Sequence, residues 1–178
     1  MKKIAIFCAN GLEECEALVV VDLLRRAKLE VDMISLEDTI NIHSSHGISF
    51  KADKLIKDIN HHSYDALILP GGLAGTKTLS QNQTLISYLH EFKDNNKLIA
   101  AICAAPSIFI DNKLVDEGKF SVYPGFEHGL KTSSLKVTVD NNVITGQGLG
   151  VVFEFAYEII KYLVDEGLAK KVLDEIQY

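Results

Sequence analysis

The sequence predicts an α/β fold in which helices cover both faces of a mostly parallel β-sheet. Short, almost wholly apolar segments alternate along the chain with segments whose apolar residues recur at helical spacing. Strands this uniformly apolar indicate burial on both faces, as in parallel sheets. No linker, internal repeat or low-complexity segment interrupts the alternation, so residues 1–178 are expected to form a single domain in three layers.

The first β-α-β unit occupies the first 35 residues. Residues 3–9 are predicted to form a buried strand that ends at Asn10-Gly11, and residues 30–35 form the second strand. Between them, acidic residues begin a helix, where negative charge suits the helix dipole. The apolar stripe of this helix has spacing i, i+3, i+4, i+7 and consists of Val20, Leu23, Leu24 and Ala27.

The middle of the chain departs from this alternation once. Residues 39–53 are predicted to form a short hairpin around Gly47, an excursion from the main sheet. Residues 55–59 form a short helix or turn. A buried strand at residues 66–69 and a helix at residues 83–94 then precede the strand that begins at Leu98.

After residue 112 we expect three more strands and two helices. The strands are predicted at residues 119–123, 136–139 and 143–145. A glycine-rich turn at residues 146–150 leads into a long helix, which Gly167 ends, and a last helix runs to the terminus. The apolar stripe of the long helix is Ala156, Ile159, Ile160 and Leu163.

Composition argues against several classes of partner. The chain has 18 basic and 24 acidic residues, a net charge of −6, so neither nucleic acid nor an anionic membrane surface is an expected partner. No apolar run approaches the roughly 18 residues of a transmembrane helix. The apolar run at residues 4–7 is too short for a signal peptide, and we expect a cytoplasmic protein.

The three cysteines indicate free thiols in a reducing compartment. Cys8, Cys15 and Cys103 include no closely spaced pair, so neither a disulfide framework nor a zinc site is expected. Cys8 lies in a strand and is interpreted as a core residue. Cys15 stands between two glutamates, which disfavour its thiolate, and is interpreted as structural.

Cys103 is different because it lies where a strand turns into a helix. It follows the apolar run 98–102, and Pro106 suits the first turn of a helix. The sulfur is thus expected beside unpaired backbone N–H groups and the positive end of the helix, which favour a thiolate of lowered pKa. Small neighbours permit a strained turn of the nucleophile-elbow type. The alternative is a buried structural cysteine.

Three glycine-bearing turns also follow apolar strands: Asn10-Gly11, Gly71-Gly72 and residues 146–148. In a parallel sheet these turns meet at the carboxyl edge, where ligands bind. A dinucleotide is disfavoured there because Glu13 and Glu14 occupy the space that a pyrophosphate needs. One of Glu13, Glu14 and Glu16 could instead face Cys103, where a protonated carboxyl would donate to the thiolate and an ionised one would raise the thiol pKa.

The chain has six histidines, which could act as partners for Cys103 or as metal ligands. His128 is the best candidate partner for Cys103, and the others are interpreted mainly as solvated surface residues without a metal. They are His43, His46, His61, His62 and His90.

Five ordered motifs resemble the ThiJ/PfpI superfamily, and within it the branch of the parkinsonism-associated protein deglycase and its bacterial relatives. They are GLEECE at residues 11–16, LPGG at 69–72, AAICAAP at 100–106, TGQG at 145–148 and FEFA at 153–156. The resemblance spans nearly the whole chain and implies a flavodoxin-like sandwich, commonly a homodimer. We expect no cofactor.

The resemblance also implies roles for individual residues. Cys103 matches the nucleophilic, easily oxidised cysteine of the elbow, and Glu16 matches a protonated glutamate that hydrogen-bonds its sulfur. Gly72 and Ala104 match backbone donors of an oxyanion site. Two positions depart from the pattern, because Tyr123 stands where many members have histidine and Ala104 where the protease-like branch has one.

The last glycine turn also departs from the family pattern. It carries Gln147 and Leu149 where arginine and proline are common, so an anionic substrate would be held weakly.

The expected function is therefore that of a cysteine-dependent enzyme acting on reactive carbonyls, a glyoxalase or deglycase handling methylglyoxal or its adducts in stress protection. The alternative is a redox sensor or redox-activated chaperone that uses oxidation of Cys103. A thiol protease is a third interpretation, which Ala104 disfavours.

Overall fold

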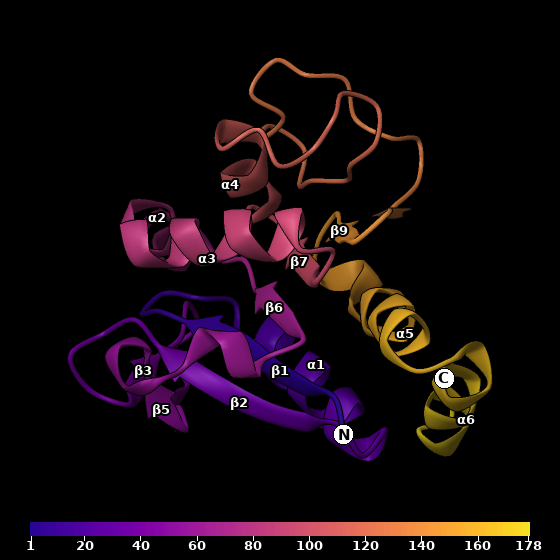
Figure 1. Ribbon diagram of the computed structural model, residues 1–178, viewed down its shortest axis with the longest axis horizontal. Helices are drawn as coiled ribbons and strands as arrows, with labels where there is room; N and C mark the ends of the chain where they lie inside the picture. Colours follow the sequence, from indigo (N-terminus) through magenta and orange to yellow (C-terminus); the bar gives the residue numbers. More distant parts are fainter.

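The computed structural model describes residues 1–178 and is built on a seven-stranded sheet (Figure 1). The strand order is β5-β2-β1-β6-β7-β9-β8, and every neighbouring pair is parallel except β8 and β9. The strands are β1 (Lys3–Cys8), β2 (Glu30–Ser35), β5 (Lys54–Leu55), β6 (Ala66–Leu69), β7 (Leu98–Ile102), β8 (Val137–Asp140) and β9 (Val143–Gly146). This is the α/β architecture that the alternating pattern predicted.

Helices cover both faces of the sheet, and each face has its own core. Alternate residues of β1 show the division, since Ile4 and Ile6 belong to one hydrophobic cluster and Ala5 and Phe7 to the other. The first cluster packs under α1 (Glu14–Arg26), α5 (Val152–Leu163) and α6 (Glu166–Glu175). The second packs under α2 (Leu73–Gln81), α3 (Gln83–Asp94) and α4 (Pro106–Asp111).

Side chains fix the beginnings of three helices. Glu13, Asn82 and Asp165 are the N-caps of α1, α3 and α6, and each accepts a hydrogen bond from a backbone N–H of the first turn. Short 3-10 turns complete the connections: η1 (Ile56–Asp58), η2 (His61–Ser63) and η3 (Leu149–Val151).

The predicted hairpin is present as an antiparallel pair separate from the main sheet, β3 (Asn41–His43) and β4 (Ser49–Lys51). It folds back over the turn after β1. The Gly11 N–H donates to the His43 carbonyl at 2.7 Å, and the Ser45 N–H donates to the Leu12 carbonyl at 2.8 Å. These bonds carry the tip of the hairpin to the carboxyl edge of the sheet.

The segment predicted as a strand at residues 119–123 is irregular, so that prediction was wrong. Its backbone groups bond to other elements: the Ser121 N–H donates to Thr145 Oγ1 at 2.9 Å, and the Tyr123 N–H donates to the Cys103 carbonyl at 2.8 Å. Residues 119–123 thus form an irregular segment across the sheet edge, here called the strap. Because its backbone groups bond to other elements, it does not form the regular hydrogen-bond ladder of a strand.

One other element prediction was wrong, one helix was not predicted, and one short element is confirmed. Gly167 lies in the first turn of α6, because α5 already ends at Leu163 and Asp165 caps the next helix. Residues 73–81 form α2, which was not predicted. The short helix or turn predicted at residues 55–59 is confirmed as η1, and the two-residue edge strand β5 precedes it.

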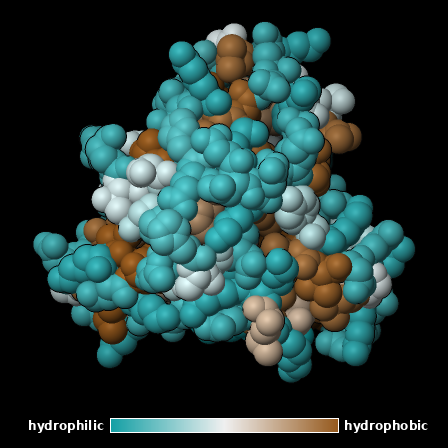
Figure 2. Space-filling model, viewed as in Figure 1, coloured by the Kyte–Doolittle hydropathy of each residue, from teal (hydrophilic) through white to brown (hydrophobic).

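Polar side chains cover most of the face seen in Figure 2, with hydrophobic patches between them. No helix is both long and apolar enough to cross a membrane.

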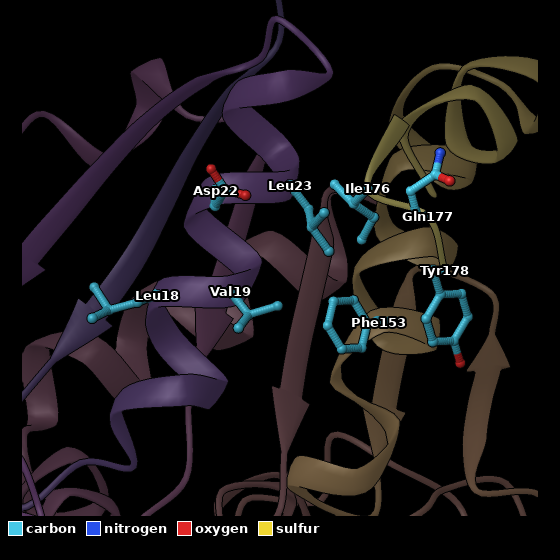
Figure 3. Close-up of a pocket in the computed structure, with 8 residues that line it drawn as sticks. All are labelled: Leu18, Val19, Asp22, Leu23, Phe153, Ile176, Gln177 and Tyr178. Atoms are coloured by element: carbon cyan, nitrogen blue, oxygen red, sulfur yellow. The ribbon is translucent and has the colours of Figure 1, made fainter. Parts of the chain in front are cut away.

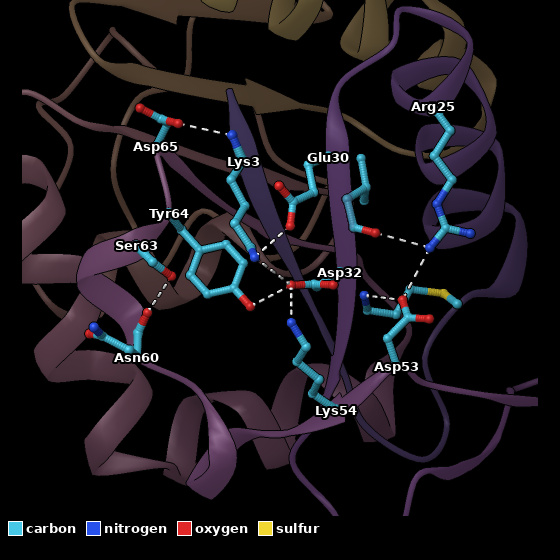
Figure 4. A network of polar contacts seen from close by, with 12 residues as sticks. Lys3, Arg25, Glu30, Asp32, Asp53, Lys54, Asn60, Ser63, Tyr64 and Asp65 are labelled. Atoms are coloured by element: carbon cyan, nitrogen blue, oxygen red, sulfur yellow. Dashed lines mark hydrogen bonds and ion pairs between the residues drawn. The ribbon is translucent and has the colours of Figure 1, made fainter. Parts of the chain in front are cut away.

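A polar network holds the edge of the sheet near β2 (Figure 4). Asp32 Oδ2 accepts hydrogen bonds from Lys54 Nζ and from the Tyr64 hydroxyl, both at 2.7 Å. Lys3 Nζ lies 3.5 Å from the same oxygen. Burial raises the pKa of Asp32, but these partners outweigh it and leave that pKa below the ordinary value.

We predict that Tyr64→Phe lowers the free energy of unfolding by about 2 kcal/mol, because it removes a buried hydrogen bond to a charged group. Tyr64 is only 2% exposed. Urea denaturation monitored by circular dichroism measures the change. Tyr162→Phe is the matched control, since Tyr162 is 41% exposed and should leave stability unchanged. Equal stability of the two variants would contradict the prediction.

Candidate active site

The carboxyl ends of four neighbouring strands, β1, β6, β7 and β9, meet at one edge of the sheet. The turns after them contain Gly11, Gly71-Gly72, Cys103 and residues 147–148. The sheet topology therefore confirms that the glycine turns and Cys103 share an edge, as the parallel order predicted.

Cys103 has a strained backbone that its neighbours hold in place. Its φ is +66°, a left-handed conformation that L-residues rarely adopt. The Cys103 N–H donates to the Gly146 carbonyl at 2.9 Å, and its carbonyl accepts from the Tyr123 N–H at 2.8 Å. These bonds tie the turn to β9 and to the strap at residues 119–123. Cys103 thus has the strained strand-to-helix geometry of a nucleophile elbow.

Two glycines make room beside the cysteine. A Cβ on Gly71 would stand 2.5 Å from the Cys103 Cβ and 2.6 Å from Glu16 Oε2, closer than real atoms approach. Gly72 has φ +91°, and a side chain there would collide with the backbone of the Gly11 turn. Only glycine at both positions lets the turn after β6 approach Glu16 and Cys103.

The three acids of the first turn have three different roles. Glu13 caps α1 by accepting the Glu16 N–H at 2.7 Å. Glu14 faces the hairpin, with Oε1 3.1 Å from His46 Nδ1 and Oε2 accepting from the Ser45 hydroxyl at 3.3 Å. Glu16 faces inward, is 1% exposed, and accepts the Gly71 N–H at 3.0 Å. Glu16 is thus the acid that contacts Cys103.

The Glu16 carboxyl is buried and hydrogen-bonded to the Cys103 thiol. Burial raises the Glu16 pKa to about 7, and the negative charge of Glu13 adds to the rise. Hydrogen bonds from Cys103 and from the Gly71 and Leu149 N–H groups oppose it. The carboxyl therefore exchanges its proton near neutral pH, as a general acid or base requires.

The pKa of the Cys103 thiol is raised, whereas the sequence predicted a lowered pKa. Burial first, and then the charge of Glu16, raise the pKa of Cys103 to about 12. The N–H groups of Ala104 and Gly72 lower it by less. The helix contributes little because α4 has only six residues and begins three positions after the sulfur. The thiolate thus depends on Glu16 keeping the proton that the pair shares.

A cavity of about 740 Å³ opens beside this pair. Glu13, His46 and Tyr123 contribute polar groups to its wall, and none of the 12 lining residues is lysine or arginine. The other lining residues are Gly11, Ser44, Ser45, Gly72, Leu73, Ala74, Cys103, Ala104 and Phe126. Tyr123 lies in the cavity as a candidate accessory group, with half of its surface exposed.

Sequence reasoning missed His46 as a lining residue. The spacing His43-x-x-His46 in a polar turn gave no signal beyond a surface histidine. Only the hydrogen bonds between the hairpin and the turn at residues 11–12 bring His46 over the cavity.

His128 and the other two cysteines lie outside the cavity wall. His128 Nδ1 is 2.6 Å from Asp111 Oδ1, so the structure does not bring this ring to Cys103. Cys8 is fully buried, which raises its pKa to about 12. Cys15 is exposed, contrary to its interpretation as a structural residue, and partial burial and then the three neighbouring glutamates raise its pKa.

A second cavity, of about 550 Å³, lies between α1 and the C-terminal segment (Figure 3). Leu18, Val19 and Leu23 line one side, opposite Phe153 and Tyr178. Its wall contains no thiol and only one acidic side chain, that of Asp22, so the nucleophilic chemistry belongs to the cavity at Cys103.

The family model described as the DJ-1/PfpI family matches residues 2–162. The chain belongs to this family. The chain is 33% identical over 176 residues to protein DJ-1 homolog B of Arabidopsis thaliana, a match that covers 96% of this chain and 40% of the relative. It is 31% identical over 178 residues to the Parkinson disease protein 7 homolog of Danio rerio, covering 96% of this chain and 94% of the relative.

Solved structures of the DJ-1/PfpI family have the same fold. An oxidised form of Toxoplasma gondii DJ-1 superposes with a TM-score of 0.95 at 34% identity, over 100% of this chain and 99% of that one. Drosophila melanogaster DJ-1beta superposes with a TM-score of 0.92 at 26% identity, over 99% and 97% of the two chains. The chain spans less than half the length of the two Arabidopsis relatives it matches.

We predict that Glu16→Gln removes a step near pH 7 from the rate of Cys103 alkylation. In the wild type the pair loses its first proton at that pH, mainly from Glu16, and the small share of the singly ionised pair that carries the charge on sulfur rises with the loss. Glutamine cannot ionise, so the thiol of the variant titrates as a single group. Peptide-resolved mass spectrometry after iodoacetamide treatment between pH 5 and 10 measures the rate, with exposed Cys15 as the internal control. Identical profiles for the two proteins would refute the coupling.

Proposed function

We propose that the protein is a cysteine-dependent enzyme that acts on small reactive carbonyl compounds such as methylglyoxal or its adducts. The observation that carries the proposal is the Glu16–Cys103 pair: the buried carboxyl exchanges its proton near pH 7, and the cysteine lines an open cavity. A thiolate beside a proton donor is the arrangement that addition to a carbonyl needs.

The proposed reaction begins when the Cys103 sulfur bonds to the aldehyde carbon of methylglyoxal. The carbonyl electron pair moves to oxygen, where the Gly72 and Ala104 N–H groups stabilise the charge and Glu16 supplies a proton. A proton then moves from the former aldehyde carbon to the neighbouring ketone carbon through an enediol, with Glu16 as the carrier. Water hydrolyses the resulting thioester to lactate and releases Cys103.

This sequence needs no external oxidant, since the aldehyde carbon is oxidised while the ketone carbon is reduced. Its sum is methylglyoxal and one water giving lactate. The cavity supports a neutral substrate, because Glu13 is the charged group on its wall near the sulfur and no basic side chain lines it. An anionic oxoacid would be held more weakly.

We predict that the purified protein converts methylglyoxal to lactate and that Cys103→Ala abolishes the turnover. The variant loses the only thiol on the cavity wall. An enzyme-coupled lactate assay in thiol-free buffer measures the rate. Cys15→Ala is the matched control and should retain full activity, because Cys15 lies outside the cavity. Equal background conversion by wild type and Cys103→Ala would overturn the proposed activity.

A redox sensor or redox-activated chaperone is the second candidate, and the partial exposure of Cys103 beside a hydrogen-bonding carboxyl favours it. A proton on Glu16 would donate to an oxygen of an oxidised cysteine and stabilise the sulfinate. The related Toxoplasma gondii DJ-1 has been solved in an oxidised form. A thiol protease stays the least favoured interpretation, because Ala104 supplies no histidine beside the nucleophile.

We predict that mild hydrogen peroxide adds two oxygens to Cys103 before it modifies Cys15. Glu16 and the Gly72 and Ala104 N–H groups can donate to the oxygens of an oxidised Cys103, whereas Cys15 is surrounded by three glutamates that raise its pKa. Mass spectrometry of the two peptides over time gives the order of oxidation. Oxidation of Cys15 with Cys103 unmodified would count against the sensor.

The homodimer that the family resemblance implies also stays a proposal.

A further inference from the structure

A cluster of ligating side chains lies at the opposite edge of the sheet from Cys103. His61 and His62 form the 3-10 turn η2, three residues before β6 begins, and Glu91 lies in the last turn of α3, which precedes β7. These are the amino ends of the same two strands whose carboxyl ends carry Gly71-Gly72 and Cys103. The reaction proposed at Cys103 uses none of the three residues.

The carboxylate of Glu91 contacts one nitrogen of each imidazole ring, and the centroids of the two rings are 3.9 Å apart. Glu91 Oε2 is 2.9 Å from His61 Nε2, and Glu91 Oε1 is 2.9 Å from His62 Nδ1. One ligand atom from each residue lies within 4.8 Å of the other two. A tetrahedral zinc ion with bonds of about 2.0–2.1 Å to nitrogen and oxygen holds its ligands slightly over 3 Å apart, so small side-chain rotations suffice to form the site.

The surroundings hold this cluster in position. The His61 ring stacks on Tyr88, with centroids 3.8 Å apart and planes 12° from parallel, and its side chain is only 16% exposed. The turn itself is fixed by two anchors. Asn60 Oδ1 accepts the His62 N–H at 3.2 Å, and Lys97 Nζ donates to the His62 carbonyl at 3.0 Å. The ligands thus need little ordering on binding, which favours affinity.

We propose that His61, His62 and Glu91 form a surface binding site for a zinc ion. Two imidazoles and one carboxylate are a ligand set that zinc uses in proteins, and the set suits zinc better than magnesium or calcium, which prefer oxygen ligands. The His62 side chain is 64% exposed, so water can complete the coordination. The sequence alone does not predict a metal site here, because adjacent histidines in a polar loop do not reveal the glutamate that lies 30 residues after His61 and contacts both rings.

Zinc at this site would bind η2 to α3 and therefore stabilise the folded chain. Binding to the native state alone shifts the unfolding equilibrium by mass action. Without metal, the same three side chains form only hydrogen-bonded or ionic pairs near the surface, which contribute little.

Isothermal titration calorimetry with zinc chloride, on protein first treated with a chelator, tests the site. We expect a zinc site in the wild type whose affinity falls at least tenfold in His61→Ala and in Glu91→Gln. His90→Ala is the matched control, because His90 is exposed on the same helix and outside the cluster. Thermal unfolding should show a zinc-dependent rise in midpoint in the wild type and in His90→Ala, but not in the two site variants.

Two further variants separate this site from other zinc ligands. Glu13, Glu14 and His46 form another group within reach of one ion, and Cys103 is a free thiol. The proposal requires that His46→Ala and Cys103→Ala retain the zinc-dependent rise in unfolding midpoint. Absence of zinc binding by the wild type, or full affinity in both His61→Ala and Glu91→Gln, would overturn it. These results are independent of turnover at Cys103.

Discussion

The burial of the Glu16 carboxyl against the Cys103 sulfur is the constraint on which the rest of the candidate site depends. Taking the carboxyl out of water raises its pKa to about 7, and its negative charge raises that of the thiol. Neither group can ionise without affecting the other, so the two share a proton over the neutral range. Carbonyl addition and cysteine oxidation both draw on this one property, which explains why both functions are proposed for one cysteine.

The surrounding fold positions the Glu16 carboxyl against the Cys103 sulfur. Parallel pairing of β1, β6 and β7 brings the start of α1, the Gly71 turn and the Cys103 turn together at one edge. Glycine at position 71 removes the Cβ that would separate the carboxyl from the sulfur, and its N–H bonds to that carboxyl. The strap at residues 119–123 and β9 hold the left-handed turn of Cys103. Strain at the cysteine is thus maintained by hydrogen bonds from two other segments.

The sequence predicted the sheet, both helical layers and the meeting of the glycine turns with Cys103, because these follow from apolar runs and parallel strand order. The spacing of the three acids could not decide which one faces inward, and the choice of Glu16 came from the family resemblance. The positions of His46 and His128, and the approach of the His61–His62 turn to Glu91 on α3, depend on loop packing that no local pattern encodes. The thiol pKa was predicted in the wrong direction because burial and the adjacent charge, which outweigh the helix end, are properties of the folded molecule.

The measurement that tests the central claim most directly is a carbon-13 NMR titration of the Glu16 carboxyl, assigned by its loss in Glu16→Gln. It reports the protonation of the buried acid itself, independently of any substrate or oxidant. A midpoint near pH 7 in the wild type is the expected result. A midpoint near the ordinary value of 4.5 would show that burial does not raise the pKa of Glu16, and would contradict the account.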